Sequence, residues 1–345
     1  MQNIPLEQVV PLVEGALGVR VSNGYLRAWR LPLDDLALHD QGLVWTASQP
    51  AGVRIRFRTD STTIRLTCEH VILGGAPAPD ARYDLVIDDE VVDTCPVAAP
   101  HANVSFGGLP GGDSVVEVWL PQEVGVRIRA VEVDDGAALA PAPDLRPRWV
   151  TYGSSITHCA GAPGPTDTWP ARAARQLGWH LTCLGYSGMC HLDPLVARAM
   201  SAVGADRFTL KLGINVHNLA SLRQRTFAPL VHGFLATLRD RHATTPITLI
   251  SPIISPDRES DPRTHLVLGE NEVVANGDLT LERMREILRD VVEKWRDRGD
   301  ANVDYLDGRT LLGEADADCL PDGLHPDDEG NRRIADRFAQ HFAAT

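Results

Sequence analysis

The chain has 345 residues, which exceeds the usual size of a single hydrophobic core and favours two domains. Its composition, 43% hydrophobic and 23% charged, is typical of a globular protein and excludes disordered and fibrous classes. The formal net charge of -13 at pH 7 disfavours nucleic acid and anionic membranes as partners, because both repel an acidic surface.

The first 19 residues lack the features of a secretory signal. No basic residue precedes the apolar positions, and Glu7 and Glu14 interrupt them. Nowhere do eighteen apolar residues follow one another, so we expect no membrane-spanning helix. The six cysteines lack the spacing of a disulfide framework, which indicates a reducing compartment. We therefore expect a cytoplasmic protein, although a mature secreted form cut from a precursor would have the same features.

Between about residues 50 and 134, apolar and polar residues alternate in short runs. In GVRIRFRT, for example, Val53, Ile55 and Phe57 alternate with arginines. Clusters rich in Gly and Pro, such as GGAPAPD, separate these runs, and no stretch of helical period interrupts them. The pattern predicts an antiparallel β-sandwich of jelly-roll type, which we place in residues 1–135.

The spacing of apolar residues changes after residues 136–147, which are rich in Ala and Pro and are predicted to be a linker. From there on, apolar strand-like runs alternate with amphipathic segments of helical period, such as the one that carries Leu281 and Met284. This alternation predicts a parallel sheet covered on both faces. We therefore expect residues 148–345 to form a doubly wound α/β domain with a central parallel sheet.

Four polar, glycine-containing segments, GSSIT, GYSG, GIN and DGLHP, follow strand-like runs of this second part. Because ligands of a doubly wound sheet bind beyond the carboxyl ends of its strands, these segments are expected to converge at one edge. Each has a structural explanation when taken singly, since a serine after a strand is more often a helix N-cap than a nucleophile. Their occurrence together favours a catalytic site.

Acyl transfer by serine requires an oriented base and donors that face the developing oxyanion. Asp322 lies three residues before His325, close enough for its carboxylate to orient the imidazole. We therefore predict Ser155 as the nucleophile, His325 as its base and Asp322 as the partner of that base. The backbone N–H groups of Ser155 and Gly188 and the side-chain NH2 of Asn215 would form the oxyanion hole.

The order of these four segments resembles that of the SGNH, or GDSL-type, hydrolase superfamily, and the resemblance covers residues 147–345. It implies the same roles for the same residues. Two positions depart from the usual pattern, because Ser154 and Val216 stand where the family usually has Asp. Neither Asp has a primary chemical role in the family. A sandwich in front of such a domain resembles a subgroup that includes a salicylyl acyltransferase of a tetracycline-type antibiotic pathway and relatives regarded as esterases.

Three residues near the predicted site, His158, Trp169 and His217, are candidates for contact with substrate. The adjacent His/Cys pairs at 158–159 and 190–191 are potential zinc ligands, but their spacing matches no known ligand framework. We therefore expect neither a metal nor a cofactor.

The functional hypothesis is transfer of an acyl group, through an acyl-Ser155 ester, from a thioester or ester donor such as an acyl-CoA. The acceptor would be a hydroxyl of a small molecule, for example a polyketide natural product. Transfer to water would make the protein an esterase, and the same residues would serve both reactions. From a different class, a sugar-binding sandwich fused to an inactive α/β domain is left open. The role of residues 252–278 is also left open, since this long connection could be a lid or a plain surface loop. A homo-oligomeric state is left open as well.

Overall fold

The structure is a computed structural model that describes residues 1–72, 80–268 and 271–343. Its N-terminal part contains two antiparallel sheets. One has the order β3-β4-β11-β6-β9, with β1 paired to β11. Its strands are β1 (Gln2–Ile4), β3 (Gly18–Ser22), β4 (Tyr25–Trp29), β6 (Thr63–Val71), β9 (His101–Gly107) and β11 (Gly125–Val133). The other has the order β12-β5-β10-β7-β8, with β2 paired to β5. Its strands are β2 (Val13–Glu14), β5 (Arg54–Thr59), β7 (Ala81–Ile87), β8 (Glu90–Val97), β10 (Ser114–Trp119) and β12 (Leu139–Pro141).

The apolar positions of these strands meet in one core between the two sheets. In β9, for example, Ala102, Val104 and Phe106 are buried and the residues between them are exposed. Successive side chains of a strand point to opposite faces, so the period of two in the sequence places every second residue in the core. The predicted antiparallel sandwich is confirmed.

Strand β12 lies in the segment that we predicted to be a linker. Leu139 pairs with Thr59 of β5, and the Thr59 hydroxyl donates a hydrogen bond of 2.6 Å to the Ala138 carbonyl. The N-terminal sheets therefore extend beyond residue 135. Pairing at the edge of a sheet uses the backbone and needs no alternation of side chains, which is why an Ala/Pro-rich segment gave no signal.

Four short helical segments precede residue 50. They are α1 (Leu6–Val9), η1 (Val10–Leu12), η2 (Leu33–Leu38) and α2 (Gln41–Ala47). The Asp40 side chain caps α2 by accepting a hydrogen bond of 2.7 Å from the Gly42 backbone N–H. Leu43 and Ala47 of α2 are buried in the core of the C-terminal part. This helix therefore connects the two parts of the chain.

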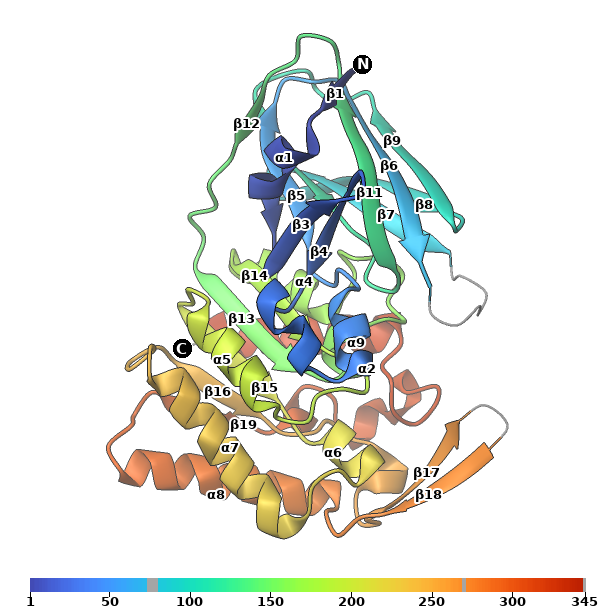
Figure 1. Ribbon diagram of the computed structural model, residues 1–345. Helices are drawn as coiled ribbons and strands as arrows, with labels where there is room; N and C mark the ends of the chain where they lie inside the picture. The colour runs from blue at the N-terminus through green and yellow to red at the C-terminus, as the bar shows by residue number, and fades with distance from the viewer. Residues whose placement is uncertain (73–79, 269–270, 344–345) are drawn as a thin grey trace.

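The C-terminal part is built on a five-stranded parallel sheet of order β14-β13-β15-β16-β19, below the two antiparallel sheets in Figure 1. Its strands are β13 (Arg148–Gly153), β14 (His180–Gly185), β15 (Arg207–Lys211), β16 (Ile247–Ile250) and β19 (Val303–Leu306). Trp149 packs against Trp169 and Phe338 on one face, whereas Tyr152 stacks on Phe234 on the other. Both faces of the sheet are therefore covered, as the sequence predicted.

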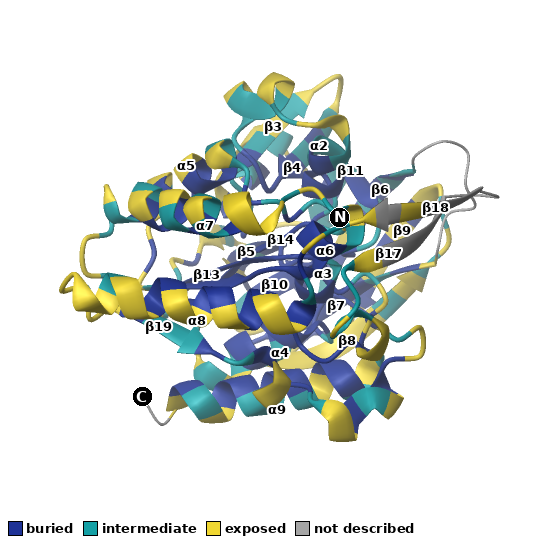
Figure 2. Cartoon of the chain, turned by 90° about the horizontal axis from the view of Figure 1, so that it is seen from below, coloured by how far each residue is buried: buried dark blue, intermediate teal, exposed yellow. Residues whose placement is uncertain are grey.

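Five helices cover the sheet and show a buried face and an exposed face (Figure 2). They are α4 (Trp169–Leu177), α5 (Pro194–Ala202), α7 (Gln224–Arg239), α8 (Leu281–Asp297) and α9 (Asp328–Ala343). Helices α4 and α9 pack together, as do α5 and α7, and α7 contacts α8. The strand order, with helices on both sides, is that of a doubly wound domain, and the predicted α/β fold class is confirmed.

Shorter elements lie in the connections of this domain. They are α3 (Ser155–His158), α6 (Ile214–Leu219), η3 (Pro256–Arg258), η4 (Gly308–Thr310), η5 (Glu314–Cys319) and the strands β17 (Arg263–Leu268) and β18 (Asn271–Asn276). Strands β17 and β18 pair antiparallel and project from the body of the domain in Figure 1. The long connection 252–278 thus contains a two-stranded sheet; residues 269–270 lie outside the described part. Its role as a lid stays a prediction.

The sandwich packs directly on strand β14. A Cβ atom at Gly52 would lie 2.8 Å from the Cys183 Cβ atom, so only glycine allows this approach. Trp119 of the sandwich belongs to the same buried cluster as Leu181 of β14. In the described ranges, no helix combines the length and the apolar composition needed to cross a lipid bilayer.

Candidate active site

Ser155 is the first residue of α3, directly after strand β13. The preceding Ser154 caps this helix, because its hydroxyl oxygen accepts a hydrogen bond of 3.3 Å from the Ile156 backbone N–H. A Cβ atom at Gly153 would lie 2.3 Å from the Thr157 Oγ1 atom, which explains the glycine at this tight turn. The two serines thus have different local roles. Ser154 completes the helix, and the Ser155 hydroxyl is available for another contact.

The Ser155 hydroxyl belongs to a hydrogen-bonded chain with His325 and Asp322. Ser155 Oγ lies 2.9 Å from His325 Nε2, and His325 Nδ1 lies 2.6 Å from Asp322 Oδ2. An ionised carboxylate only accepts hydrogen bonds, so Nδ1 carries the imidazole proton and Nε2 is left to accept the Ser155 hydroxyl. This arrangement can remove a proton from Ser155 Oγ.

The Asp322 carboxylate is held by the loop that carries His325. Its Oδ1 atom accepts the backbone N–H groups of Leu324, at 3.0 Å, and His325, at 2.6 Å. Partial burial acts to raise the pKa of Asp322, but the hydrogen bonds from His325 and Leu324 outweigh it and lower this pKa below its ordinary value. Asp322 is therefore ionised at neutral pH and orients the imidazole.

Asn215, in α6, is buried, and its Oδ1 atom accepts a hydrogen bond of 3.1 Å from the Cys190 backbone N–H. This contact orients the side-chain amide. Its NH2 group has no hydrogen-bond partner among the described residues and can donate to another group. A fixed amide with an unused NH2 is what an oxyanion donor requires.

Gly188 lies in the turn after β14 with a left-handed backbone, at φ +72°. His191, weighed from the sequence as one of the potential zinc ligands, stabilises this turn. Its Nε2 atom lies 2.9 Å from the Gly188 carbonyl oxygen, and its Nδ1 atom lies 2.8 Å from the Ser221 hydroxyl. Because the carbonyl only accepts, Nε2 donates and Nδ1 accepts from Ser221.

A cavity of about 400 Å³ opens beside the Ser155 hydroxyl. It lies between the residues of α3 and the segment that leads into α9. Its lining is mostly small or apolar and consists of Ser155, Ile156, Cys159, Ala160, Gly161, Ser187, His325, Pro326 and Asn331. The volume is in the range of small-molecule sites. Ser155 and His325 therefore face a cavity that can hold an acyl group.

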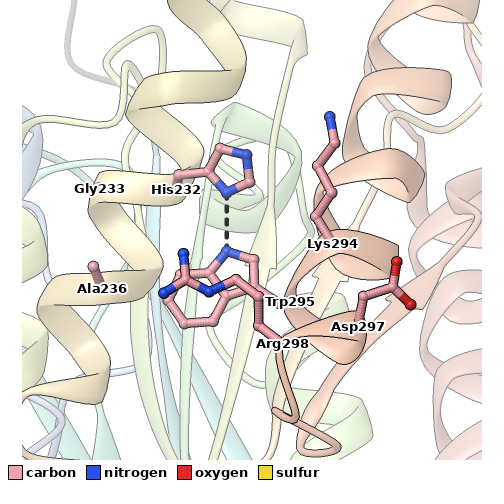
Figure 3. A pocket seen from close by; sticks show the side chains of 7 residues that line it. All are labelled: His232, Gly233, Ala236, Lys294, Trp295, Asp297 and Arg298. Atoms are coloured by element: carbon pink, nitrogen blue, oxygen red, sulfur yellow. Dashed lines mark hydrogen bonds between the residues drawn. The ribbon is translucent and has the colours of Figure 1, made fainter.

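A larger hollow of about 730 Å³ lies elsewhere, between α7 and α8 (Figure 3). In it the Trp295 indole N–H donates a hydrogen bond of 2.9 Å to His232 Nδ1. None of the predicted site residues lines this hollow. Ser155 and His325 thus line the smaller cavity and not the larger hollow.

The three residues predicted to contact substrate are buried elsewhere, and none lines the cavity beside Ser155. His158 Nε2 donates to the Gln122 carbonyl at 2.6 Å, and the Trp169 indole N–H donates to the Ile156 carbonyl at 2.8 Å. His217 Nε2 lies 2.9 Å from the Asp261 carbonyl. Their position argues against the predicted contact with substrate. Proximity in sequence to a site residue does not determine the direction in which a side chain points.

Asn331 is a residue of the cavity that sequence reasoning missed. Its NH2 group donates to the carbonyls of Pro326, at 3.2 Å, and Asp327, at 2.9 Å, while its Oδ1 atom accepts from Cys159 Sγ at 3.2 Å. It therefore connects the segment after His325 to the end of α3. A polar residue three positions before Ile334, on the buried face of α9, was the available signal.

Among the described residues, one group has the spacing of a metal site: Glu14, Asp144 and His180, at the junction of the two parts. Arginines already neutralise both carboxylates. Arg54 bonds Glu14 at 3.0 Å, and Arg146 bonds Asp144 at 2.9 Å. We therefore assign no metal to this group, and the chemistry of the Ser155 site requires none.

Lys211, at the end of β15, is only 2% exposed, and burial lowers the pKa of its amine to about 8, from 10.5. At pH 7 the amine is charged in both the folded and the unfolded state, so the full cost of burying the charge opposes folding. We expect Lys211→Met to raise the free energy of unfolding at pH 7 by on the order of 3 kcal/mol. Urea titration would measure this gain.

The gain from Lys211→Met should shrink as the pH rises from 8 towards 10.5. In that interval the folded wild-type protein has lost the proton and the unfolded chain is losing it, so the cost disappears. A gain that does not change with pH would contradict this account.

Comparison with known proteins agrees with the geometry. Residues 147–343 match the GDSL-like lipase/acylhydrolase family, and residues 12–126 match the N-terminal domain of SsfX3. The salicylyl-acyltransferase SsfX3 from a tetracycline biosynthetic pathway is 31% identical, with a TM-score of 0.85 over 97% of this chain and 95% of that chain. No match is found among curated proteins.

Two more distant structures share the fold. A proposed GDSL-like lipase from Bacteroides ovatus is 20% identical, with a TM-score of 0.77 over 99% of this chain and 97% of that chain. A family two carbohydrate esterase from Clostridium thermocellum is 15% identical, with a TM-score of 0.62 over 85% and 92%. The family match spans more than half of the chain and agrees with the four sequence segments. The protein therefore belongs to the GDSL-like lipase/acylhydrolase family and is an SGNH-type enzyme with an SsfX3-type N-terminal domain.

Proposed function

We propose that the protein is a serine acyltransferase that passes an acyl group through an acyl-Ser155 ester to a hydroxyl of a small molecule. The observation that carries this proposal is the hydrogen-bonded chain from Ser155 Oγ through His325 to Asp322, which opens on a largely apolar cavity. A serine next to a neutral imidazole that can accept its proton is an activated nucleophile.

The first half-reaction forms the ester. His325 Nε2 takes the proton of Ser155 Oγ while Oγ attacks the carbonyl carbon of the donor. The carbonyl oxygen becomes an oxyanion, which the N–H groups of Ser155 and Gly188 and the NH2 group of Asn215 stabilise. When the tetrahedral intermediate collapses, the thiol or alcohol leaves with the proton from His325. The Asp322 carboxylate stabilises the imidazolium throughout.

The second half-reaction releases the acyl group. The acceptor hydroxyl gives its proton to His325, attacks the acyl-Ser155 carbonyl and displaces Ser155 Oγ, which recovers the proton. An acyl-CoA is the proposed donor and a hydroxylated polyketide the proposed acceptor, in the cytoplasm and without a cofactor. Support comes from the similarity over both parts of the chain to a salicylyl acyltransferase of a tetracycline pathway.

Hydrolysis is the second candidate function, and one observation favours it. The side chains of His325 and Asp322 are 46% and 54% exposed, so water has access to the base. Water activated by His325 would convert the acyl-enzyme into a free acid, and the protein would be an esterase.

Transfer and hydrolysis are distinguished by whether the acyl-enzyme reacts with an alcohol or with water. We would incubate the protein with a panel of acyl-CoA thioesters and aryl esters, with and without alcohols, and follow the adduct by intact-protein mass spectrometry. Transfer predicts that the adduct decays faster with rising alcohol concentration and that the new ester accumulates. Decay at one rate regardless of alcohol would establish the esterase. No adduct, and no labelling by a fluorophosphonate, would favour the sugar-binding sandwich with an inactive α/β domain.

A further inference from the structure

Arg30, directly after β4, joins the N-terminal sheets to the turn that carries Gly188. Its Nη1 group donates to the backbone carbonyls of Cys183, at 3.2 Å, and Gly185. The Tyr186 hydroxyl donates to the Arg30 carbonyl, and the guanidinium lies 5.0 Å from the centre of the Tyr186 ring. Side chain and backbone of Arg30 thus both hold the chain just before Gly188.

The same guanidinium reaches the helix that begins at Ser155. Arg30 Nη2 lies 3.4 Å from His158 Nδ1, and His158 Nε2 lies 2.6 Å from the Gln122 carbonyl oxygen. Because that carbonyl only accepts, His158 Nε2 carries the proton and Nδ1 accepts from Arg30. The Gln122 side chain also donates to the Ala162 carbonyl at 3.0 Å. The N-terminal part therefore holds the C-terminal end of α3, at His158, and the segment that follows it.

The remaining donors of Arg30 stay within the N-terminal part. Nε donates to the Gln49 carbonyl at 2.7 Å, and Nη2 donates to the Thr46 carbonyl at 2.7 Å. A guanidinium has five N–H donors, and all five have an acceptor here. The charge is fully buried, and no ion pair found within the described residues includes Arg30.

Burying a cation without a carboxylate partner costs free energy, whereas an apolar side chain of similar volume would fill the same space without that cost. Burial accordingly lowers the pKa of Arg30. An apolar residue would, however, leave the four backbone carbonyls that Arg30 bonds without this donor, which also costs free energy. What an apolar residue cannot do is bridge the carbonyls of β14 and the ring of His158 at fixed distances.

We infer that Arg30 is a positioning residue that sets the placement of the Ser155 helix relative to the Gly188 turn, so that the N-terminal sheets form part of the catalytic framework. The inference rests on the proposed acyl transfer at Ser155. It assigns to the sandwich a role in the chemistry of the second domain, although none of the sandwich residues that the structure describes lines the cavity beside Ser155.

The test is Arg30→Lys, which keeps the charge but replaces five directed donors by three on one nitrogen. We expect kcat to fall by roughly 10²-fold with KM nearly unchanged, because a displacement of reacting groups by about 1 Å costs that much. Near-UV circular dichroism would establish the folded fraction.

Arg54→Lys is the matched control. Arg54 is also a buried arginine of the sandwich whose Nη1 group donates to a β14 carbonyl, that of Leu181, at 3.0 Å. Leu181 lies near the start of β14, away from the Gly188 turn. We expect a comparable loss of thermal stability and a wild-type kcat. If both variants lost activity only in proportion to their unfolded fraction, Arg30 would be a structural residue and the inference would be wrong.

The rate of labelling by a fluorophosphonate separates the two proposals, because it depends on Ser155 and the oxyanion donors and on no particular acyl donor. Lack of labelling of the wild type would overturn acyl transfer itself. Labelling of wild type and Arg30→Lys at one rate would overturn only the role of Arg30. Should Arg30→Lys fail to fold, Tyr186→Phe decides, since it removes only the hydroxyl bonded to the Arg30 carbonyl. A several-fold lower labelling rate supports the inference, and a wild-type rate contradicts it.

Discussion

Ser155→Ala will form no acyl-enzyme with any donor that acylates the wild type, and its kcat will fall by about six orders of magnitude. Removing a serine nucleophile from a comparable hydrogen-bonded set has this effect, because the covalent route is lost and only binding and the oxyanion donors remain. His325 and Asp322 keep their own hydrogen bond in the variant, so the fold should be retained. Intact-protein mass spectrometry after brief incubation with the donor measures the adduct.

Ser154→Ala is the matched control, one residue away. Within the described part of the chain, the Ser154 hydroxyl bonds the Ile156 backbone N–H and so caps α3. Its loss should lower the free energy of unfolding by about 1 kcal/mol and leave the adduct in place. An adduct on Ser155→Ala, together with its absence on Ser154→Ala, would move the nucleophile to the neighbouring serine and refute the assignment.

The second large effect is expected for Asn215→Ala, with kcat lower by roughly 10²–10³-fold and KM little changed. The loss reflects one missing donor to an oxyanion that exists only near the transition state. The variant also leaves the Cys190 backbone N–H without its acceptor, which should lower the free energy of unfolding by about 1–2 kcal/mol. Steady-state kinetics with an aryl ester, corrected for the folded fraction, gives both quantities.

Asn218→Ala, on the same helix, serves as the control for this variant. Asn218 is partly buried, and its Oδ1 atom accepts a hydrogen bond of 3.1 Å from Arg258 Nε. We expect wild-type kcat. Equal losses of kcat in the two variants would mean that Asn215 acts by supporting α6 and that the oxyanion has other donors.

The fold and the family were predictable from the sequence because both depend on local features. Alternation at Val53, Ile55 and Phe57 marks a strand with one buried face, and helical periodicity around Met284 marks a helix on a sheet. The polar segments at Ser155 and His325 are short, and each is positioned by the strand or helix next to it. Since a doubly wound sheet brings the carboxyl ends of its strands together, the order of the segments was sufficient to predict their convergence.

The direction of side chains next to the site was not predictable in this way. His158 and Trp169 flank the nucleophile segment, yet both are buried in contacts with backbone carbonyls of Gln122 and Ile156. The direction of His158 depends on how the two domains dock, and that of Trp169 on how α4 packs against α3. Neither kind of packing has a periodic signature in the sequence. The edge strand β12 was missed for a related reason, since backbone pairing leaves no side-chain pattern.

The sequence by itself thus indicated the two-part architecture, the parallel sheet and the four polar segments of the predicted site, because each of them is marked by a local pattern of residues. Only the tertiary structure shows which residues hold that site in place through hydrogen bonds. Arg30 meets the Cys183 carbonyl across 153 positions of sequence, and Asn331 meets Cys159 across 172. Such contacts form only when elements that are distant in the sequence pack together. The residues around Arg30 contain no pattern that indicates which carbonyls the arginine will bind.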